Sequence, residues 1–409
     1  MKRTRIFHSL QQRNFRIFFI GQLISLHGTW MQSVAQAWLV YRLTESGFML
    51  GLTGTATLLP ALIFGLFGGA LADRFNRKKL LIVVQTLAMV QAVVLAVLTL
   101  AGWITPWLIV GMALLLGFVQ AVETPIRQSF VAQLVPRETL HNAIGLNSSM
   151  FHLARFIGPA TAGFLVAWFG EGVVFAINAL SFLAVIVSLG FIRETPKPTE
   201  SDASGKYQGF WAGLRFAAEH SLVGAALLTV ALTSIFGSSI IILLPIYVAE
   251  IFNRGPQSLG WLMAMLGAGS LMAALSLAGR QNIFRLEKRI AAAGVSMAIC
   301  LMLFSWNAMY GLALLILPVV GFAATSIYAS SNALVQFAVP DPLRGRIMAI
   351  YTVCLHGMVS LGQLALGALA DWTGAPLTVM LSATCLLATV GFTAMVMLRA
   401  AAAADNNSV

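Results

Sequence analysis

The feature that most constrains this chain is a recurring run of about 20 apolar residues, the length that an α-helix needs to cross a bilayer. Only 10% of the residues are charged and 59% are hydrophobic, so a soluble fold would lack polar surface to present to water. The runs predict an all-α membrane protein with twelve transmembrane helices, near residues 15–42, 48–71, 79–101, 107–132, 141–169, 171–192, 222–249, 257–279, 289–306, 309–337, 345–371 and 375–398.

Lysine and arginine are unevenly distributed between alternate loops. Of the 25 cationic residues, Arg42 and Arg254 lie in loops on one side, Arg127 and Arg155 lie within predicted spans, and the others lie on the opposite side. Cytoplasmic loops carry such an excess of positive charge. We therefore expect both termini to be cytoplasmic. The net charge of +11 then reflects membrane topology, and no nucleic-acid partner is expected.

A polar stretch rich in Pro, Ser and charge divides the chain into two sets of six spans. We predict an N-terminal six-helix bundle at 1–192, a cytoplasmic linker with an amphipathic segment at 193–220, and a C-terminal six-helix bundle at 221–409. The halves also repeat: at an offset of 204, residues 152–170 and 356–374 share His152/His356, Gly158/Gly362, Gly163/Gly367, Leu165/Leu369, Trp168/Trp372 and Gly170/Gly374. Two parallel repeats predict a transporter with its substrate site between the halves, near the membrane midplane.

Three short motifs resemble those of the major facilitator superfamily, and the resemblance covers nearly the whole chain. They are Gly69-x-x-x-Asp73-Arg74-x-x-Arg77-Lys78 after the second span, Glu123-Thr124-Pro125 in the fourth, and Gly158-Pro159-x-x-x-Gly163 in the fifth. The last two are similar to the drug- and siderophore-efflux branch, including its enterobactin-exporter-like and macrolide-efflux-like members.

The resemblance implies roles for two of these motifs. Gly69, Asp73, Arg74 and Arg77 would form a cytoplasmic latch against the start of the eleventh helix, just after Asp341-Pro342. Gly158, Pro159 and Gly163 would form an antiporter-like motif, although ordinary small-residue packing also explains them. Asn76 stands where the family usually has glycine; asparagine tolerates a left-handed backbone almost as well.

Glu123 is the carboxylate that lies well within a predicted span. A buried ion needs a partner, so we expect Glu123 to pair with Arg155, with Arg127, or with each in different states. If transport is coupled to protons, Glu123 is the best candidate for the carboxyl group that binds them. The alternatives are the histidines His27, His152 and His356.

Polar residues at helical spacing form stripes on four predicted spans. In lipid such stripes face other helices or a water-filled cavity. We predict a central cavity that they line, while interhelical hydrogen bonding without a cavity is the alternative for any single residue. The stripes contain Gln22, Ser25, Thr29, Gln32, Ser33 and Gln36; Gln120, Glu123, Thr124 and Arg127; Thr229, Thr233 and Ser234; and Thr325, Tyr328, Asn332 and Gln336.

These features predict a secondary active transporter that exports a small amphiphilic molecule, a siderophore or a drug, by alternating access and proton antiport. A lysolipid or broad multidrug transporter is one alternative, and a non-transporting membrane receptor or scaffold is another. The sequence contains no GxxxxGK nucleotide-binding loop and no metal-ligand or catalytic-triad spacing. We expect no enzyme activity, no cofactor and no metal. The expected partners are a small-molecule substrate, protons and the bilayer, and we expect a monomer in the bacterial cytoplasmic membrane.

Overall fold

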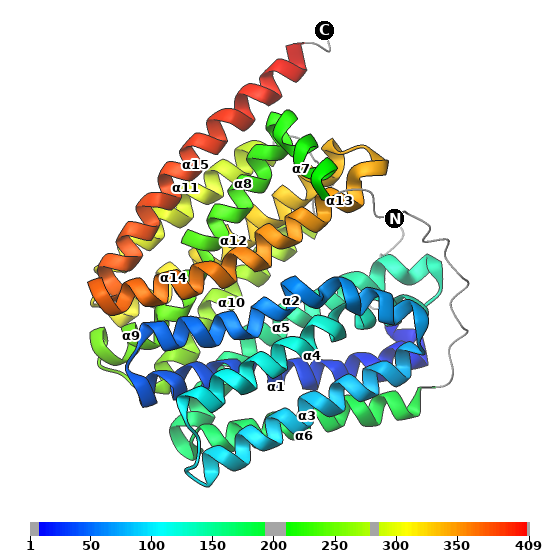
Figure 1. The fold of residues 1–409 in the computed structure, drawn as a ribbon, viewed down its shortest axis with the longest axis vertical. Helices are drawn as coiled ribbons and strands as arrows, with labels where there is room; N and C mark the ends of the chain where they lie inside the picture. Colours follow the sequence, from blue (N-terminus) through cyan, green and yellow to red (C-terminus); the bar gives the residue numbers. More distant parts are fainter. Residues whose placement is uncertain (1–7, 193–209, 279–285, 407–409) are drawn as a thin grey trace. The chain divides into compact units, whose positions relative to one another are not determined.

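The computed structural model describes residues 8–192, 210–278 and 286–406; of these, the side chains of 65–74, 210–212, 278, 341–342 and 401–406 are not described. Within the described residues the regular secondary structure is helical (Figure 1). The part before the predicted linker contains η1 (His8–Gln11), α1 (Arg13–Thr44), α2 (Gly47–Arg74), α3 (Arg77–Leu100), α4 (Pro106–Gln133), α5 (Arg137–Phe169) and α6 (Glu171–Phe191).

The part after the linker is more broken. It contains α7 (Phe210–Glu219), α8 (Ser221–Phe236), η2 (Ser238–Leu243), α9 (Leu244–Ile246), η3 (Tyr247–Ile251), α10 (Pro256–Ala278), α11 (Leu286–Ser305), α12 (Tyr310–Ala338), α13 (Asp341–Thr352), η4 (Val353–Gly357), α14 (Met358–Thr373) and α15 (Ala375–Asn406). The seventh predicted span thus changes from α-helix to a 3-10 turn after Gly237, and η3 and η4 are π-helical turns. Glycine disfavours a continuous helix, which accounts for the first of these breaks.

Eleven helices of the described chain are long and apolar enough to cross a membrane, against the twelve that the sequence predicts. The difference is α1, whose stripe of Gln, Ser and Thr lowers its mean hydropathy. Its 32 residues correspond to about 48 Å at the helical rise, so its length suffices. A twelfth span and the orientation of the termini stay predictions.

The amphipathic segment of the predicted linker forms a helix, α7, as its pattern indicates. Arg215 donates to Glu219 Oε1 at 2.8 Å on its exposed face, and this hydrogen bond raises the pKa of the guanidinium. Because both side chains are exposed, the pair contributes little to stability.

Two repeat-related glycines end helices in the same way. Gly170 follows α5 with φ 78°, and Gly374 follows α14 with φ 81°. Only glycine adopts this backbone region at low cost, and its amide bonds back to the preceding turn in both cases. The shared local structure explains this identity between the repeats.

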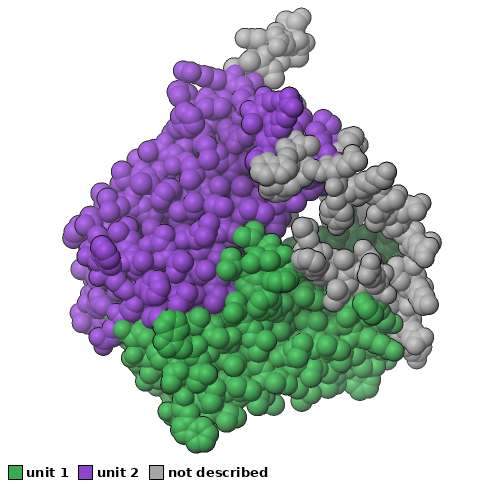
Figure 2. Space-filling model, in the orientation of Figure 1, with its two compact units in different colours: residues 1–44, 59–203, 255–264 green, residues 45–58, 204–254, 265–409 purple. Residues whose placement is uncertain are grey.

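The described chain falls into two compact units, coloured in Figure 2. Unit 1 comprises residues 1–44, 59–203 and 255–264, and unit 2 comprises 45–58, 204–254 and 265–409. Each unit therefore includes a short segment from the other half of the sequence. The division into six-helix repeats at 1–192 and 221–409 stays a prediction.

Each unit has its own core. In unit 1, α6 packs against both α1 and α3, and close contact is possible because Gly21 and Gly28 of α1 lie against Ser188 and Ser181 of α6. A buried apolar cluster of this unit includes Phe15, Phe18 and Phe130. In unit 2, α11 packs between α12 and α15, and α8 packs against α15 and α12. Tight helix contacts through small residues are typical of membrane proteins.

Candidate functional site

The most distinctive polar group in unit 1 is an ion pair inside α4. Arg127 Nε donates to Glu123 Oε1 at 2.8 Å, and the two side chains are 10% and 13% exposed. A spacing of four residues places both on one face of the helix, with the acid on the N-terminal side, which is the favourable order. The structure thus shows Arg127 as the partner of Glu123 out of the two cations that the sequence left open.

Neighbouring helices extend this pair. Gln85 of α3 donates through Nε2 to Glu123 Oε1 at 3.4 Å, and Arg127 Nη1 donates to Asn147 Oδ1 of α5 at 3.5 Å. Neither Gln85 nor Asn147 was among the predicted site residues. Gln85 interrupts an apolar run in the third predicted span, and this interruption is the sequence feature that could have indicated a site residue. The result is a polar cluster built from α3, α4 and α5.

Arg155, the other cation predicted inside a span, lies against α1. Its guanidinium carbon is 5.5 Å from the centroid of the Trp30 ring, a cation–π contact. Trp30 in turn packs edge-on against Phe151. A role for Arg155 in one network with Glu123 and Arg127 stays a prediction.

The polar stripe of α1 turns largely inward within unit 1. Gln22, Ser25, Gln32 and Gln36 are all buried, and Thr29 bonds back to the Ser25 carbonyl. Such burial is the interhelical alternative that the sequence left open, and it is clearest at Gln32.

Gln32 links three helices. Its Nε2 donates to Gln91 Oε1 of α3 at 3.2 Å, and its Oε1 accepts from Asn178 Nδ2 of α6 at 2.7 Å. Asn178 also accepts from Ser181 Oγ at 2.9 Å. A cavity-lining role for Gln32 stays a prediction, and Gln91 and Asn178 are partners that the stripes did not reveal.

Unit 2 has a polar cluster centred on Tyr328 of α12. Its hydroxyl lies 2.7 Å from Ser238 Oγ and 3.3 Å from Ser234 Oγ, and its carbonyl accepts from Tyr351 Oη at 2.7 Å. One turn along α12, Asn332 accepts from Gln336. Ser234 of the stripe predicted on the seventh span therefore contacts Tyr328 of the stripe predicted on the tenth.

The remaining predicted lining residues differ in burial. Thr233 is fully buried, whereas Gln120 and Thr325 are half-buried. The hydroxyl of Thr233 has no hydrogen-bond partner within the described part of the chain. Whether these three residues face a cavity stays a prediction.

The antiporter-like motif packs against two different helices. Gly158 of α5 lies against Trp30 and the His27 carbonyl of α1, while Gly163 lies against Pro256, Gln257 and Gly260 at the start of α10. Pro159 is buried, and its carbonyl faces Gly260. The motif therefore makes the close helix contacts that its small residues indicate, and its antiporter role stays a prediction.

The three histidines considered for proton binding have different surroundings. His27 Nε2 lies 3.1 Å from Thr161 Oγ1, one helical turn from Gly158. His152 is half-buried, and its Nδ1 has no hydrogen-bond partner among the described residues. His356 is exposed and lies in the π-helical turn η4.

The predicted cytoplasmic latch lies mostly outside the described side chains, which omit those of Gly69, Asp73 and Arg74. Arg77 begins α3. The expectation for Asn76 is wrong in its reason: its φ is −65°, and its side chain caps α3 by accepting from the Lys79 amide at 3.2 Å. Asparagine is a strong N-cap residue, which explains its presence in place of glycine.

Lys78 in the same loop has a defined partner. Its ammonium group donates to the carbonyl of Ile192, the C-cap residue that follows α6, at 2.7 Å. A cation at a helix C-terminus offsets the negative end of the helix dipole. This contact adds a structural role to the topological role that the sequence indicates for the lysines.

Unit 2 also contains a hydrogen-bonded carboxylate, Asp371, that no sequence motif indicated. Asp371, near the end of α14, accepts from Ser46 Oγ at 2.7 Å, from the Phe48 amide at 3.1 Å and from the Gly47 amide. The acceptor therefore satisfies the first amides of α2, as an N-cap residue would. We call these four residues the Asp371 clamp.

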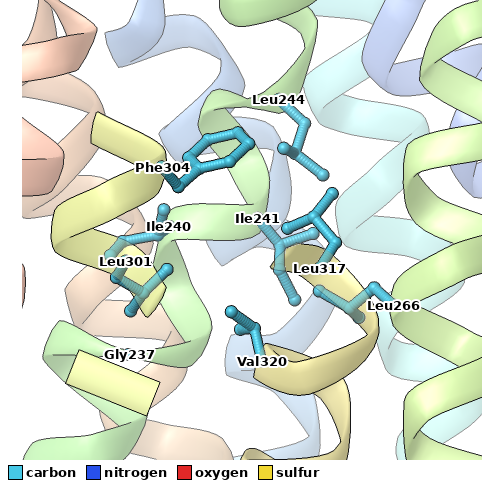
Figure 3. A pocket seen from close by; sticks show the side chains of 9 residues that line it. All are labelled: Gly237, Ile240, Ile241, Leu244, Leu266, Leu301, Phe304, Leu317 and Val320. Atoms are coloured by element: carbon cyan, nitrogen blue, oxygen red, sulfur yellow. The ribbon is translucent and has the colours of Figure 1, made fainter. Parts of the chain in front are cut away.

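A small cavity in unit 2 adjoins the broken seventh span (Figure 3). Its volume is about 10 Å³, and its lining is apolar, formed by Gly237, Ile240, Ile241, Leu244, Leu266, Leu301, Phe304, Leu317 and Val320. That volume approximates one water molecule, and the walls offer no polar side chain to hold one. The cavity is a packing defect beside the break and is too small for a cargo molecule.

The described residues contain no group of three or more His, Cys, Asp or Glu that could hold a metal ion. The three cysteines do not pair with one another.

Comparison with known proteins gives consistent relatives. The staphyloferrin A transporter of Staphylococcus aureus is 26% identical over 370 residues, covering 88% of this chain and 90% of that protein. The multidrug efflux pump Tap of Mycolicibacterium fortuitum is 24% identical over 356 residues, covering 85% and 87%. The enterobactin exporter EntS of Shigella flexneri is 24% identical over 370 residues, covering 90% and 87%.

The fold is also similar to that of a solved transporter structure. The crystal structure of the nucleoside transporter NupG superposes with a TM-score of 0.69 at 14% identity, covering 95% of this chain and 98% of that one. The family model described as transmembrane secretion effector matches residues 4–409. The chain is thus a multi-pass membrane transporter rather than an enzyme, and it belongs to the transmembrane secretion effector family of the major facilitator superfamily.

Proposed function

We propose that this protein is a proton-coupled exporter of a small amphiphilic molecule, either a siderophore or a drug-like compound. The two six-helix repeats, 1–192 and 221–409, would alternate between inward- and outward-open states around a central site. The family and the relatives support transport, since these relatives bear the names of siderophore transporters and a multidrug efflux pump.

The observation that best supports proton coupling is the Glu123–Arg127 ion pair in α4. A largely buried carboxylate is costly unless it is paired or protonated, so the group has two well-defined states. Gln85 and Asn147 hold the two ends of the pair from neighbouring helices. An acid with this environment in the middle of a span is rarely retained for packing alone.

The same pair suggests how the protein would exchange a proton for a cargo molecule. The carboxylate of Glu123 accepts hydrogen bonds, so a cargo with O–H or N–H donors would bind while this group is charged. A proton on Glu123 removes the charge and one acceptor, and the cargo loses its anchor. Proton and cargo would therefore exclude one another, which is the condition that antiport requires. Arg127 would complement oxygen-rich groups of a neutral or anionic cargo.

Transport into inverted membrane vesicles tests this proposal. The full-length protein is assayed with an imposed pH gradient, acidic inside, against a panel of siderophores, macrolides and lysolipids. We expect uptake of a siderophore or drug that collapses when the gradient is dissipated. Glu123→Gln should abolish gradient-driven uptake, and Arg127→Ala should do the same. Broad uptake of unrelated drugs would favour the multidrug function that the relationship to Tap suggests.

Glu171 provides a matched control for Glu123. It is also a buried glutamate of unit 1 paired with an arginine, since Arg42 Nε donates to its Oε1 at 2.8 Å. It begins α6 and thus lies at a helix end rather than in mid-helix. We expect Glu171→Gln to retain gradient-driven uptake. Equal loss in both variants, or no uptake of any compound by correctly folded protein, would contradict the proposal.

A further inference from the structure

Gln85 of α3 contacts Glu123 with only one side of its amide. The side chain is 4% exposed, and Nε2 donates to Glu123 Oε1, the same oxygen that accepts from Arg127. The other amide atom, Oε1, is also buried. Among the residues whose side chains are described, it has no hydrogen-bond partner. A buried carbonyl oxygen without a donor is costly, so this arrangement calls for an explanation.

A second glutamine on the same helix shows what a fully satisfied amide looks like. Gln91 is 1% exposed; its Nε2 donates to the Met112 carbonyl at 3.2 Å, and its Oε1 accepts from Gln32. Both ends of that amide are used. Of these two buried glutamines of α3, it is therefore Gln85, beside the carboxylate, whose amide oxygen lacks a hydrogen-bond donor.

The protonation chemistry of Glu123 supplies the missing donor. A carboxylate only accepts hydrogen bonds, and the amide N–H of Gln85 serves that state. A protonated carboxyl group gains one O–H donor, which needs an acceptor. A half-turn of the Gln85 amide about its last torsion exchanges Nε2 for Oε1 without moving the helix. The same side chain can therefore satisfy both protonation states.

The remaining contacts of Glu123 are compatible with this exchange. Arg127 is the charged side chain that the described structure places against Glu123, and it is held at its other end by the neutral Asn147. Arg127 stays protonated throughout, because guanidinium does not lose its proton in proteins. The only proton that moves is the one that Glu123 gains from, or returns to, the transport pathway.

We propose that Gln85 is the positioning residue for the coupling proton: it donates to the Glu123 carboxylate and, when Glu123 is protonated, turns its amide and accepts from the carboxyl O–H. This inference rests on the proposed proton coupling at Glu123. It assigns the orphaned Oε1 a partner that exists in only one half of the transport cycle.

Infrared difference spectroscopy of the full-length protein in lipid nanodiscs, between acidic and alkaline pH, tests the contact directly. A protonated buried carboxyl group has a C=O stretching band, and the band of Glu123 is the one that Glu123→Gln removes. Gln85→Met keeps the side-chain length and removes the amide. We expect it to shift this band to higher frequency, because the carboxyl group loses a hydrogen bond. Gln91→Met is the control and should leave the band in place.

Transport gives the second readout. Gln85→Met should slow gradient-driven export about fivefold, the factor that corresponds to one net hydrogen bond. Cargo exchange without a gradient should stay within about twofold, because it needs no proton transfer. If Gln85→Met does not fold, Gln85→Asn retains an amide but withdraws it by one methylene, and it should produce a smaller shift in the same direction.

The outcomes separate this inference from the proposed function. An unchanged Glu123 band in Gln85→Met overturns the inference, even if proton-driven export is demonstrated. The absence of any Glu123-dependent band over the pH range in which the protein is folded also overturns it. A band that shifts as expected supports the inference, even in a protein for which no cargo is found, and in that case the proposed export function fails alone.

Discussion

The contact of α5 with α10 in unit 1 and the contact of α14 with α2 in unit 2 both use repeat-related glycines, and the second adds side-chain hydrogen bonds. A Cβ atom on Gly163 would lie 3.0 Å from the Gly260 Cα atom. A Cβ atom on Gly367 would collide with the carbonyl of Gly47 and lie 3.1 Å from Gly51 Cα. Both contacts bring helix backbones together, as small-residue motifs do in membranes.

The α14–α2 contact adds side-chain hydrogen bonds to this packing. Thr55 Oγ1 donates to the Ser360 carbonyl at 2.8 Å, and the Asp371 clamp holds the first turn of α2. In α5 the residue equivalent to Asp371 at the repeat offset is Ala167, which is exposed. The two segments with matching residues therefore share a glycine contact, while a polar clamp distinguishes one of them. A contact held by one carboxylate can be weakened by a change at that single group.

The largest effects should come from filling the glycine contacts. Gly163→Val and Gly367→Val each insert a branched side chain between two backbones, and we expect each to lower the free energy of unfolding by about 1–3 kcal/mol. Thermal unfolding of the purified protein in one detergent measures both. Gly111→Val is the control, because a Cβ at Gly111 meets nothing within 4 Å. Equal stability of Gly163→Val and Gly111→Val would refute the close α5–α10 contact.

Removing the Asp371 clamp should lower the free energy of unfolding less than filling the glycine contacts does. Asp371→Ala leaves the amides of Gly47 and Phe48 without their acceptor, so we expect a loss of about 1–2 kcal/mol, as for a removed N-cap. Hydrogen exchange of these two amides should accelerate, while that of the first amides of α10 should not. In the reverse experiment, Ala167→Asp should add no stability to α5. Unchanged exchange at Gly47 and Phe48 would show that the clamp does not hold α2.

A smaller effect is expected from the hydrogen bond in the middle of the α14–α2 contact. Thr55→Val keeps the side-chain shape but removes the hydroxyl donor to Ser360, and we expect a loss of about 0.5–1.5 kcal/mol. Thr53→Val is the matched control, since the Thr53 hydroxyl bonds within its own helix to Met49. The two variants are compared by their thermal midpoints. A larger loss in Thr53→Val would contradict the interhelical role of Thr55.

The smallest effect concerns Gln363, which occupies the position equivalent to Pro159. Its Oε1 faces Gly54 and has no hydrogen-bond partner among the described residues. Gln363→Met removes that unpaired oxygen at similar volume, so we expect a gain of up to about 1 kcal/mol. The measurement is the same thermal midpoint. A clear loss would mean that the amide has a partner, such as a buried water molecule.

Some contacts of the candidate site were predictable from the sequence, and others were not. The spacing of Glu123 and Arg127 placed both on one helix face, and the structure shows them paired at 2.8 Å. The small residues of the fifth span predicted close helix contacts, which Gly158 and Gly163 make. The sequence, however, left both Arg127 and Arg155 open as partners of Glu123, and no local pattern encodes the contact of Arg155 with Trp30 of α1.

The polar stripes illustrate the other limit. Their helical spacing predicted faces that avoid lipid, and Gln22, Gln32 and Gln36 of α1 are buried. Periodicity cannot say whether such a face meets water or another helix. Gln32 meets Gln91 and Asn178, which come from two other helices of unit 1. Isolated polar residues in apolar runs, such as Gln85, carry no periodic signal, although one of them completes the candidate site.

By itself, the sequence determined that this chain is a polytopic helical membrane protein of a transporter family, with Glu123 and Arg127 on one face of a predicted span. These properties follow from run length, loop charge and residue spacing, all of which act locally along the chain. Only the tertiary structure decided that Asp371 caps a helix 324 positions away, and that Gln85 lies against Glu123. Such partners are set by the packing of whole helices, whose relative rotation no short stretch of sequence specifies.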